Sequence, residues 1–153
     1  YPDLDGNFEV INYLGFLSRL IEEGKLATDP RIFEGKILTY HDPCYLGRAN
    51  NIYDDPRRIL RALGGKLTEM ERNRSRALCC GAGGAQMFKE AEKGDKEIFI
   101  ERTGDALNTG ASVIATACPF CMTMITDGLK YKNREEEIRN LDIAELVAQS
   151  LGL

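Results

Sequence analysis

Residues 112–125, SVIATACPFCMTMI, carry the clearest structural signal in the chain. Its first part, residues 112–117, is a short β-prone and largely apolar run, which predicts a buried strand. Pro119 suits the first turn of a helix, and apolar residues then continue at helical spacing. The sequence therefore predicts a strand that leads directly into a helix, with Cys118 and Cys121 at the junction.

The same alternation of strand and helix extends in both directions along the chain. Further strands are predicted at residues 36–41, 66–70 and 138–141. Strands that alternate with helices indicate an α/β fold, with a mostly parallel sheet flanked by helices. The other predicted helices cover residues 7–23, the segment between Asp54 and Gly64, residues 85–108 with interruptions at its glycines, and residues 142–150.

This fold class predicts where a ligand site lies. In a parallel sheet the loops that leave the carboxyl ends of the strands gather along one edge, and ligands bind there. Cys44, Cys118 and Cys121 each follow a predicted strand, and the Cys79-Cys80 pair lies on a loop. We expect these five cysteines to converge on one site at the loop edge of the sheet.

Composition limits the class of protein. The formal net charge of -4 offers no basic surface, so nucleic-acid binding is not expected, and the apolar runs are too short for a transmembrane segment in this chain. Five cysteines cannot all pair within the chain, which favours a reducing compartment and a cytoplasmic location. The chain begins with Tyr1, and we expect it to be a piece of a longer polypeptide. Any membrane association is expected through a partner or a segment outside this chain.

An iron-sulfur cluster is the first chemistry that five thiolates predict. Its several metal positions can accept sulfurs from diverging side chains, and neighbours such as Cys79 and Cys80 tend to point apart. Gly81 lets the backbone come close, and Gly83 belongs to a Gly-rich loop whose N–H groups can face cluster sulfur. The helix start at Pro119 adds partial positive charge, so these two glycines and this proline are predicted to contribute to cofactor binding.

Zinc is the second possibility. Four of the cysteines could make a tetrahedral all-thiolate site, with Cys118 and Cys121 as its short-spaced half. One thiolate would be left over, and the adjacent pair Cys79-Cys80 matches the other half of a typical zinc site poorly. In that case the chain would be a zinc-stabilised assembly or interaction module whose surface, including the first amphipathic helix, docks a partner.

Thiol-disulfide exchange is the third possibility. Cys-Pro-Phe-Cys between a strand and a helix is typical of a thioredoxin or glutaredoxin active site. In that family the motif follows an early strand and a later cis-proline faces it, whereas no proline follows Pro119 in this chain. The motif alone therefore supports this interpretation only weakly.

Three motifs together carry a family resemblance: HDPCYLGR at residues 41–48, Cys79-Cys80-Gly81, and TACPFC at residues 116–121. In this order they resemble the CCG, or cysteine-rich, domain of heterodisulfide reductase subunits and of glycolate and lactate oxidase iron-sulfur subunits. The resemblance spans roughly residues 36–145. It implies a CCG domain over residues 36–153, preceded by an N-terminal helical segment at residues 1–35.

The resemblance also implies a cofactor and a role. All five cysteines, Cys44, Cys79, Cys80, Cys118 and Cys121, would bind a noncubane [4Fe-4S] cluster, and some family members bind zinc instead. The implied function is electron transfer, with disulfide reduction in heterodisulfide reductases. The implied partners are flavoprotein or ferredoxin-type subunits or domains. Because the family commonly carries two such domains and this chain holds one, we expect a redox domain of a larger oxidoreductase.

The remaining polar residues receive structural interpretations. His41, the single histidine, is predicted to hydrogen-bond a backbone carbonyl beside the strand end. Four arginines could attract an acidic partner, but on a helix such residues usually form a solvated face. We therefore predict a solvated surface for Arg48, Arg57, Arg58 and Arg61.

Three apolar residues lie within or just after the second cysteine motif. Phe120, Met122 and Met124 are predicted to pack beneath the cluster or in the core. There they would exclude water and so tune the reduction potential.

Overall fold

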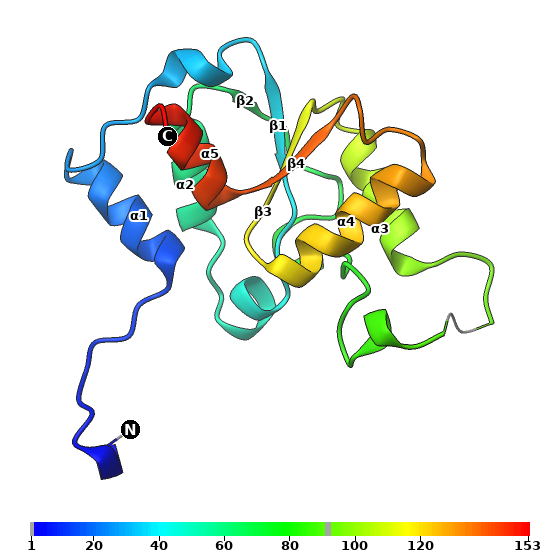
Figure 1. Cartoon of the computed structure of the whole chain (residues 1–153), viewed down its shortest axis with the longest axis horizontal. Coiled ribbons are helices and arrows are strands. Elements are labelled where there is room, and N and C mark those ends of the chain that lie inside the picture. The colour runs from blue at the N-terminus through cyan, green and yellow to red at the C-terminus, as the bar shows by residue number, and fades with distance from the viewer. Residues whose placement is uncertain (1, 91–92) are drawn as a thin grey trace.

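The computed structural model describes residues 2–90 and 93–153 of the chain. Within these residues four strands form one sheet in the order β2-β1-β3-β4, and each neighbouring pair is parallel (Figure 1). The α/β fold with a parallel sheet is therefore confirmed. The strands are β1 (Ile37–Tyr40), β2 (Lys66–Leu67), β3 (Val113–Thr116) and β4 (Arg139–Asp142).

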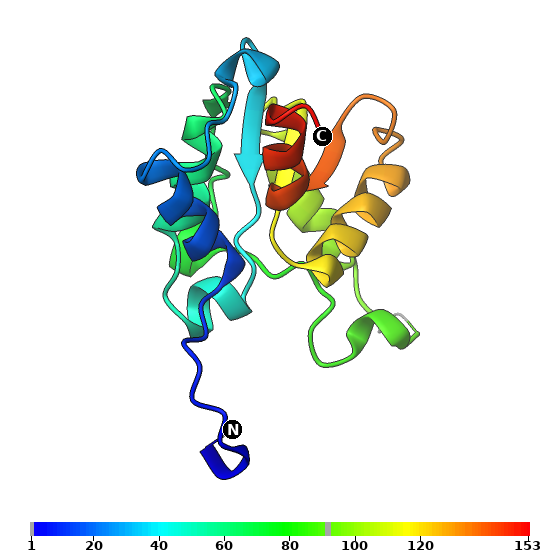
Figure 2. The same cartoon turned by 60° about the vertical axis from the view of Figure 1, so that its left-hand side comes forward.

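Helices cover both faces of the sheet (Figure 2). One face is covered by α1 (Tyr13–Glu22), α2 (Asp54–Ala62) and α5 (Ile143–Ser150). The other face is covered by α3 (Ile98–Leu107) and α4 (Pro119–Tyr131). In the described ranges, no helix combines the length and the hydrophobicity that crossing a bilayer requires.

Alternation along β3 supplies both layers of the core. Val113 and Ala115 pack into the cluster that includes Leu38 and the buried faces of α1, α2 and α5. Ile114 points the other way and packs with Ile125 of α4. Successive side chains of a strand face opposite sides of the sheet. Because helices cover both sides, every residue of the central strand β3 is buried, as the run VIAT shows.

The strand order reverses direction at one point in the sheet. The chain passes from β1 outward to β2, then crosses to β3 and continues outward to β4 in the opposite direction. Ligands of parallel sheets bind where the order reverses, outside the carboxyl ends of the strands. In this sheet the reversal lies between β1 and β3, and these two strands lead to Cys44 and to Cys118.

The first helix starts later than the sequence predicts. The expected start at residue 7 is wrong, because α1 begins at Tyr13, after Asn12. Asn12 Oδ1 accepts a hydrogen bond from the backbone N–H of Leu14 at 2.9 Å and so caps the helix. Val10 is 84% exposed, so the apolar residues before the cap have no core surface that would extend the helix.

The helix predicted over residues 85–108 is wrong in its first half. Between residues 85 and 97, the described residues form only a short 3-10 turn, Gln86–Phe88. Residues 91 and 92 of the predicted range lie outside the described residues. Gly84 and Ala85 adopt φ values of 65° and 62°. Left-handed backbone of this kind cannot continue a right-handed helix.

The segment before residue 36 contributes to the main core. Leu14 and Phe33 are fully buried in the same cluster as Leu38 and Tyr40 of β1. Tyr13 Oη also donates a hydrogen bond to Asp142 Oδ1 at 3.0 Å, beside the start of α5. A domain boundary at residue 36 remains a prediction.

Candidate metal centre

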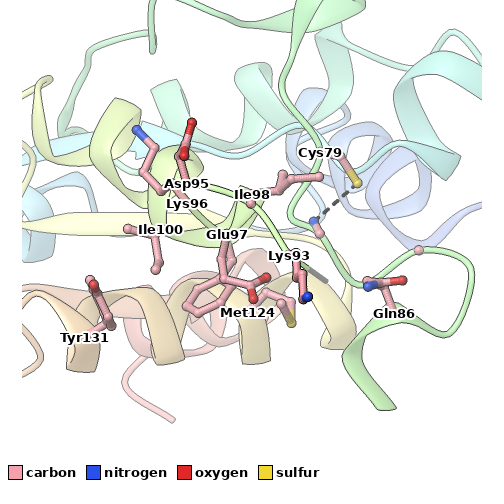
Figure 3. A pocket seen from close by; sticks show the side chains of 14 residues that line it. Cys79, Gln86, Lys93, Asp95, Lys96, Glu97, Ile98, Ile100, Met124 and Tyr131 are labelled. Carbon is pink, nitrogen blue, oxygen red and sulfur yellow. Dashed lines mark hydrogen bonds between the residues drawn. The ribbon is translucent and has the colours of Figure 1, made fainter. Parts of the chain in front are cut away.

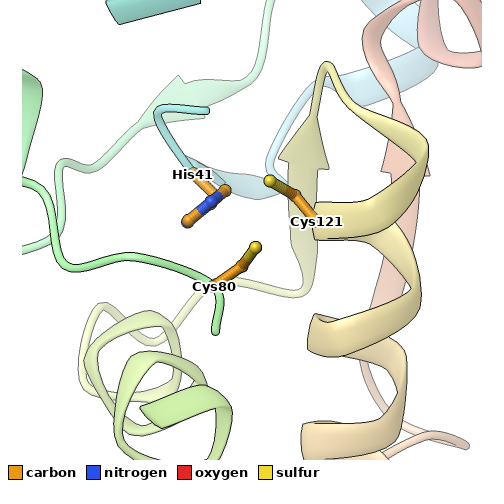
Figure 4. A group of neighbouring side chains, drawn as sticks. All are labelled: His41, Cys80 and Cys121. Carbon is orange, nitrogen blue, oxygen red and sulfur yellow. The ribbon is translucent and has the colours of Figure 1, made fainter. Parts of the chain in front are cut away.

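Two cysteines and the histidine meet at the loop edge of the sheet. A ring nitrogen of His41 and the Sγ atoms of Cys80 and Cys121 all lie within 4.8 Å of one another, and all three residues are buried (Figure 4). His41 follows β1, Cys80 lies in the connection from β2 to α3, and Cys121 is in the first turn of α4. Three segments that are remote in sequence therefore bring metal-binding atoms to one place.

Two more cysteines pack around this group. Cys80, Cys121 and Ala82 form a small buried cluster, and Cys79 and Cys118 pack against it while remaining partly exposed. Cys118 is the residue before α4, at the helix N-terminus. The structure therefore gathers four of the five predicted ligands in one contact group.

Cys44 lies at the edge of the site and is exposed. It precedes a π-helical turn, Tyr45–Ala49, in which Ala49 N donates a hydrogen bond to the carbonyl of Cys44 at 3.2 Å. Cys44, Cys118 and Cys121 line one cavity of about 590 Å³. This cavity joins the exposed cysteine to the buried part of the group.

The Gly-rich loop shapes the position of Cys79. Gly81 adopts a φ of 94°, and its backbone N–H donates a hydrogen bond to Cys79 Sγ at 3.3 Å (Figure 3). Gly83 is exposed, and a side chain at its Cα would meet no atom within 4 Å. Both glycines and Cys79 line a second cavity of about 820 Å³, which also reaches Met124 of α4. Gly81 therefore contacts a cysteine sulfur through its backbone, whereas Gly83 lies exposed at the same cavity.

The thiols of the adjacent pair are held in their neutral form when no metal is present. The pKa of Cys79 lies well above its usual value, because its thiol hydrogen-bonds Cys80 and because it is partly buried. A hydrogen bond with Cys121 raises the pKa of Cys80 to about 11. Metal binding displaces protons from such thiols, and the positive charge of the metal stabilises the thiolates. A group of free, clustered thiols of this kind fits a thiophilic metal or an iron-sulfur cluster.

His41 makes a different contact from the one predicted. Among the described residues, no backbone carbonyl accepts a hydrogen bond from its side chain; instead, its Nδ1 accepts one from Arg102 Nε at 2.9 Å. Burial, and then the charge of Arg102, lower the pKa of His41 to about 3, so the ring is neutral. Arg102 lies 61 positions along the chain, so no local sequence signal could have identified the pair.

The prediction of a solvated arginine face is wrong for Arg57. It is fully buried and forms ion pairs with Asp42 and Glu69, both at 2.7 Å. Arg48 and Arg61 are exposed as predicted, and Arg58 is partly exposed. Because Asp42 lies between His41 and Cys44, Arg57 supports the backbone of the site rather than a docking surface.

The three apolar residues after Pro119 differ in how far they are buried. Phe120 is 53% exposed, so its predicted packing beneath the cluster or in the core is wrong. The first turn of α4 turns this side chain outward while it turns Cys121 inward. Met122 is partly buried. Met124 is also partly buried and packs against the cysteine group, as predicted.

Three relatives cover nearly the whole chain. The probable iron-sulfur-binding oxidoreductase FadF of Bacillus subtilis is 45% identical over 152 residues, which are 99% of this chain and 21% of that protein. The EtfAB:quinone oxidoreductase of Syntrophomonas wolfei is 41% identical over 157 residues, 99% of this chain and 22% of that protein. A subunit of the dihydromethanophenazine:CoB--CoM heterodisulfide reductase of Methanosarcina barkeri is 39% identical over 149 residues, 95% of this chain and 35% of that protein. The chain thus spans between a fifth and about a third of the length of these curated relatives.

A family model gives the same result. The model described as the cysteine-rich domain, CCG, matches residues 38–126, which is more than half of the chain. The matched range contains His41 and all five cysteines. The chain therefore belongs to the CCG family of cysteine-rich domains.

Proposed function

We propose that this chain is an iron-sulfur redox domain that transfers electrons within a larger oxidoreductase of the heterodisulfide reductase type. The observation that carries the proposal is the meeting of Cys80, Cys121 and their sulfur neighbours at the point where the strand order reverses. The names of the relatives support it, since they include an iron-sulfur-binding oxidoreductase and a heterodisulfide reductase subunit. When bound, an iron-sulfur cluster supplies one-electron transfer.

The proposed ligands are Cys44, Cys79, Cys80, Cys118 and Cys121. The spread of the donors favours a cluster over a single ion, because they extend from a buried pair to an exposed cysteine across a cavity of about 590 Å³. A zinc ion takes four ligands at about 2.0–2.3 Å, which leaves one of five thiolates without a role. We further propose that the cluster is a noncubane [4Fe-4S] cluster, which would use all five.

Three other residues have proposed supporting roles. The N–H of Gly81 donates to Cys79 Sγ and would stabilise the thiolate there. The backbone N–H of Gly83, which any residue at this position would keep, would face cluster sulfur. Pro119 would start α4 so that the partial positive charge of the helix lies beside Cys118. Each effect stabilises an anionic group.

Electron exchange with a partner would take place at the Cys44 side. Cys44 is exposed, so one edge of the cluster would lie close to the surface, whereas Cys80 and Cys121 are shielded from water. We propose a flavoprotein or ferredoxin-type subunit or domain as the electron-transfer partner. We also propose a cytoplasmic location, with membrane contact made through a partner or a segment outside this chain.

A redox titration of the anaerobically purified chain tests this function. We expect visible absorption that bleaches on reduction and returns on reoxidation, together with a paramagnetic signal in one of the two states. A chain that holds stoichiometric zinc, lacks visible absorption and cannot be reduced would contradict the proposal and would favour the zinc-stabilised module. Retained disulfide-exchange activity after complete chelation would instead favour a dithiol enzyme.

A further inference from the structure

His41 carries a buried N–H group that has no acceptor among the described residues. An arginine side chain can only donate hydrogen bonds, so His41 Nδ1, which receives Arg102 Nε–H at 2.9 Å, must be the acceptor nitrogen. In a neutral imidazole the other nitrogen then carries the hydrogen. This nitrogen, Nε2, is buried and has no hydrogen-bond partner in the described part of the chain.

The protein scaffold fixes this tautomer. Arg102 is fully buried, and its Nη1 donates to the backbone carbonyl of Arg72 at 2.7 Å and to Asp105 Oδ2 at 3.2 Å. Arg102 belongs to α3, and none of these contacts to its guanidinium involves a cysteine. The direction of the hydrogen bond to His41 is therefore set before any cofactor binds.

The tautomer excludes the most obvious role for His41. With Cys80 and Cys121 it forms a group that has the composition of a metal site. A metal ligand, however, must offer a free lone pair, and Arg102 occupies Nδ1 while a hydrogen occupies Nε2. His41 can therefore approach the two cysteines as a hydrogen-bond donor and not as a ligand.

A buried N–H without an acceptor destabilises a folded chain, so an unused donor beside a group of sulfur atoms is informative. On the basis of the proposed cluster, we propose that His41 Nε2–H donates a hydrogen bond to a sulfur atom of that cluster and thereby sets its reduction potential. Hydrogen bonds to sulfur are one of the protein's means of setting the potential of such clusters. The donor stabilises the additional negative charge of the reduced form, so it raises the potential. His41 is thus a tuning residue, which Arg102 positions.

Selective isotope labelling tests the contact in the unmodified protein. Because the chain contains one histidine, [ring-15N]histidine labels only this imidazole, provided that purification uses a tag without histidine. With the cluster poised in its paramagnetic state, pulsed electron paramagnetic resonance should detect a weak 15N coupling from this imidazole, together with exchangeable proton couplings that are lost in D2O. A strong coupling, typical of a directly bound nitrogen, or no coupling at all would overturn the inference.

Substitution tests the effect on the potential. We expect His41→Leu to retain the iron and sulfide content but to lower the ratio of reduced to oxidised cluster at a fixed potential by about tenfold, which is about 59 mV for a one-electron couple. His41→Gln, whose amide can still donate, should recover part of this shift. An unchanged potential in His41→Leu contradicts the inference. If that variant does not fold, the isotope measurement decides.

These outcomes separate the two proposals. Absence of iron and sulfide from the unmodified chain would contradict the proposed function itself. A chain with a normal cluster but without coupling to His41 would remove only the role of the histidine.

Discussion

The guanidinium of Arg57 donates two hydrogen bonds to the carboxylate of Asp42, from Nη1 to Oδ1 at 2.7 Å and from Nη2 to Oδ2 at 2.9 Å. Both side chains are buried. Arg57 Nε also donates to Glu69 at 2.7 Å, and Asp42 accepts the backbone N–H of Arg74 at 2.8 Å. One buried arginine thus connects the end of β1, the helix α2 and the segment that leads to Cys79.

Replacement of Arg57 by Met should strongly destabilise the chain. The variant leaves Asp42 buried without its counter-charge, and breaking a buried pair in this way typically costs about 3–5 kcal/mol. Arg61→Met is the matched control, because Arg61 lies on the exposed side of the same helix and should change stability by less than about 0.5 kcal/mol. Urea unfolding of the three proteins in the same metal state measures both effects. Equal midpoints for the two variants would show that the buried pair does not support the fold.

The two glycines of the cysteine loop should respond differently to Ala. At Gly81 the φ of 94° is strained for any other residue, and a new Cβ would lie 3.4 Å from Ile98 Cβ. Gly81→Ala should therefore cost about 1–3 kcal/mol and reduce iron retention. At Gly83 a Cβ meets nothing within 4 Å, so Gly83→Ala should retain both stability and iron. Thermal unfolding and iron analysis of the pair test this difference, and loss of iron in both variants would contradict it.

Cys44 should change its reactivity when the cluster binds. In the metal-free chain its exposed thiol should be alkylated before the buried Cys80 and Cys121. Loading with iron and sulfide should protect it, because a thiolate bound to iron is no longer a free nucleophile. Mass spectrometry after brief iodoacetamide treatment identifies the modified residue. Rapid alkylation of Cys44 in the loaded chain would remove it from the ligand set.

The packing of α3 against α4 makes a further pair of opposite predictions. A Cβ at Gly128 would clash with the Thr103 side chain, whose own Cβ would lie 2.8 Å away, so Gly128→Ala should destabilise by about 1–3 kcal/mol. Gly104 lies in α3 with open space around its Cα, and Gly104→Ala should stabilise the helix by about 0.5–1 kcal/mol. Thermal or urea unfolding checks both signs. Similar effects at the two positions would mean that the helices are not in close contact.

The sequence predicted the sheet because its signals are local. Short buried strands such as residues 113–116 are recognised by their composition and by the turn or helix that follows them. The loop-edge location of the cysteines then follows from the rule for parallel sheets, since Cys44 and Cys118 come directly after β1 and β3. The identity of the meeting segments was therefore predictable without coordinates.

The buried polar contacts could not be predicted in the same way. Periodicity assigns arginines to the surface, and only pairing with distant residues explains why Arg57 and Arg102 are buried. Asp42 is 15 positions from Arg57, and His41 is 61 positions from Arg102. The start of α1 was missed for a related reason, since Val10 has the apolar character of a core residue but no core surface against which to pack.

Metal and sulfide analysis shows whether the five cysteines hold one cluster. Iron, acid-labile sulfide and zinc are quantified in the anaerobically purified chain and in its five single Cys→Ser variants. We predict equal amounts of iron and sulfide in the unmodified chain, and a loss of both when Cys44, Cys79, Cys80, Cys118 or Cys121 is replaced. Stoichiometric zinc without sulfide, or full iron and sulfide content in any of the five variants, would contradict a cluster held by all five cysteines.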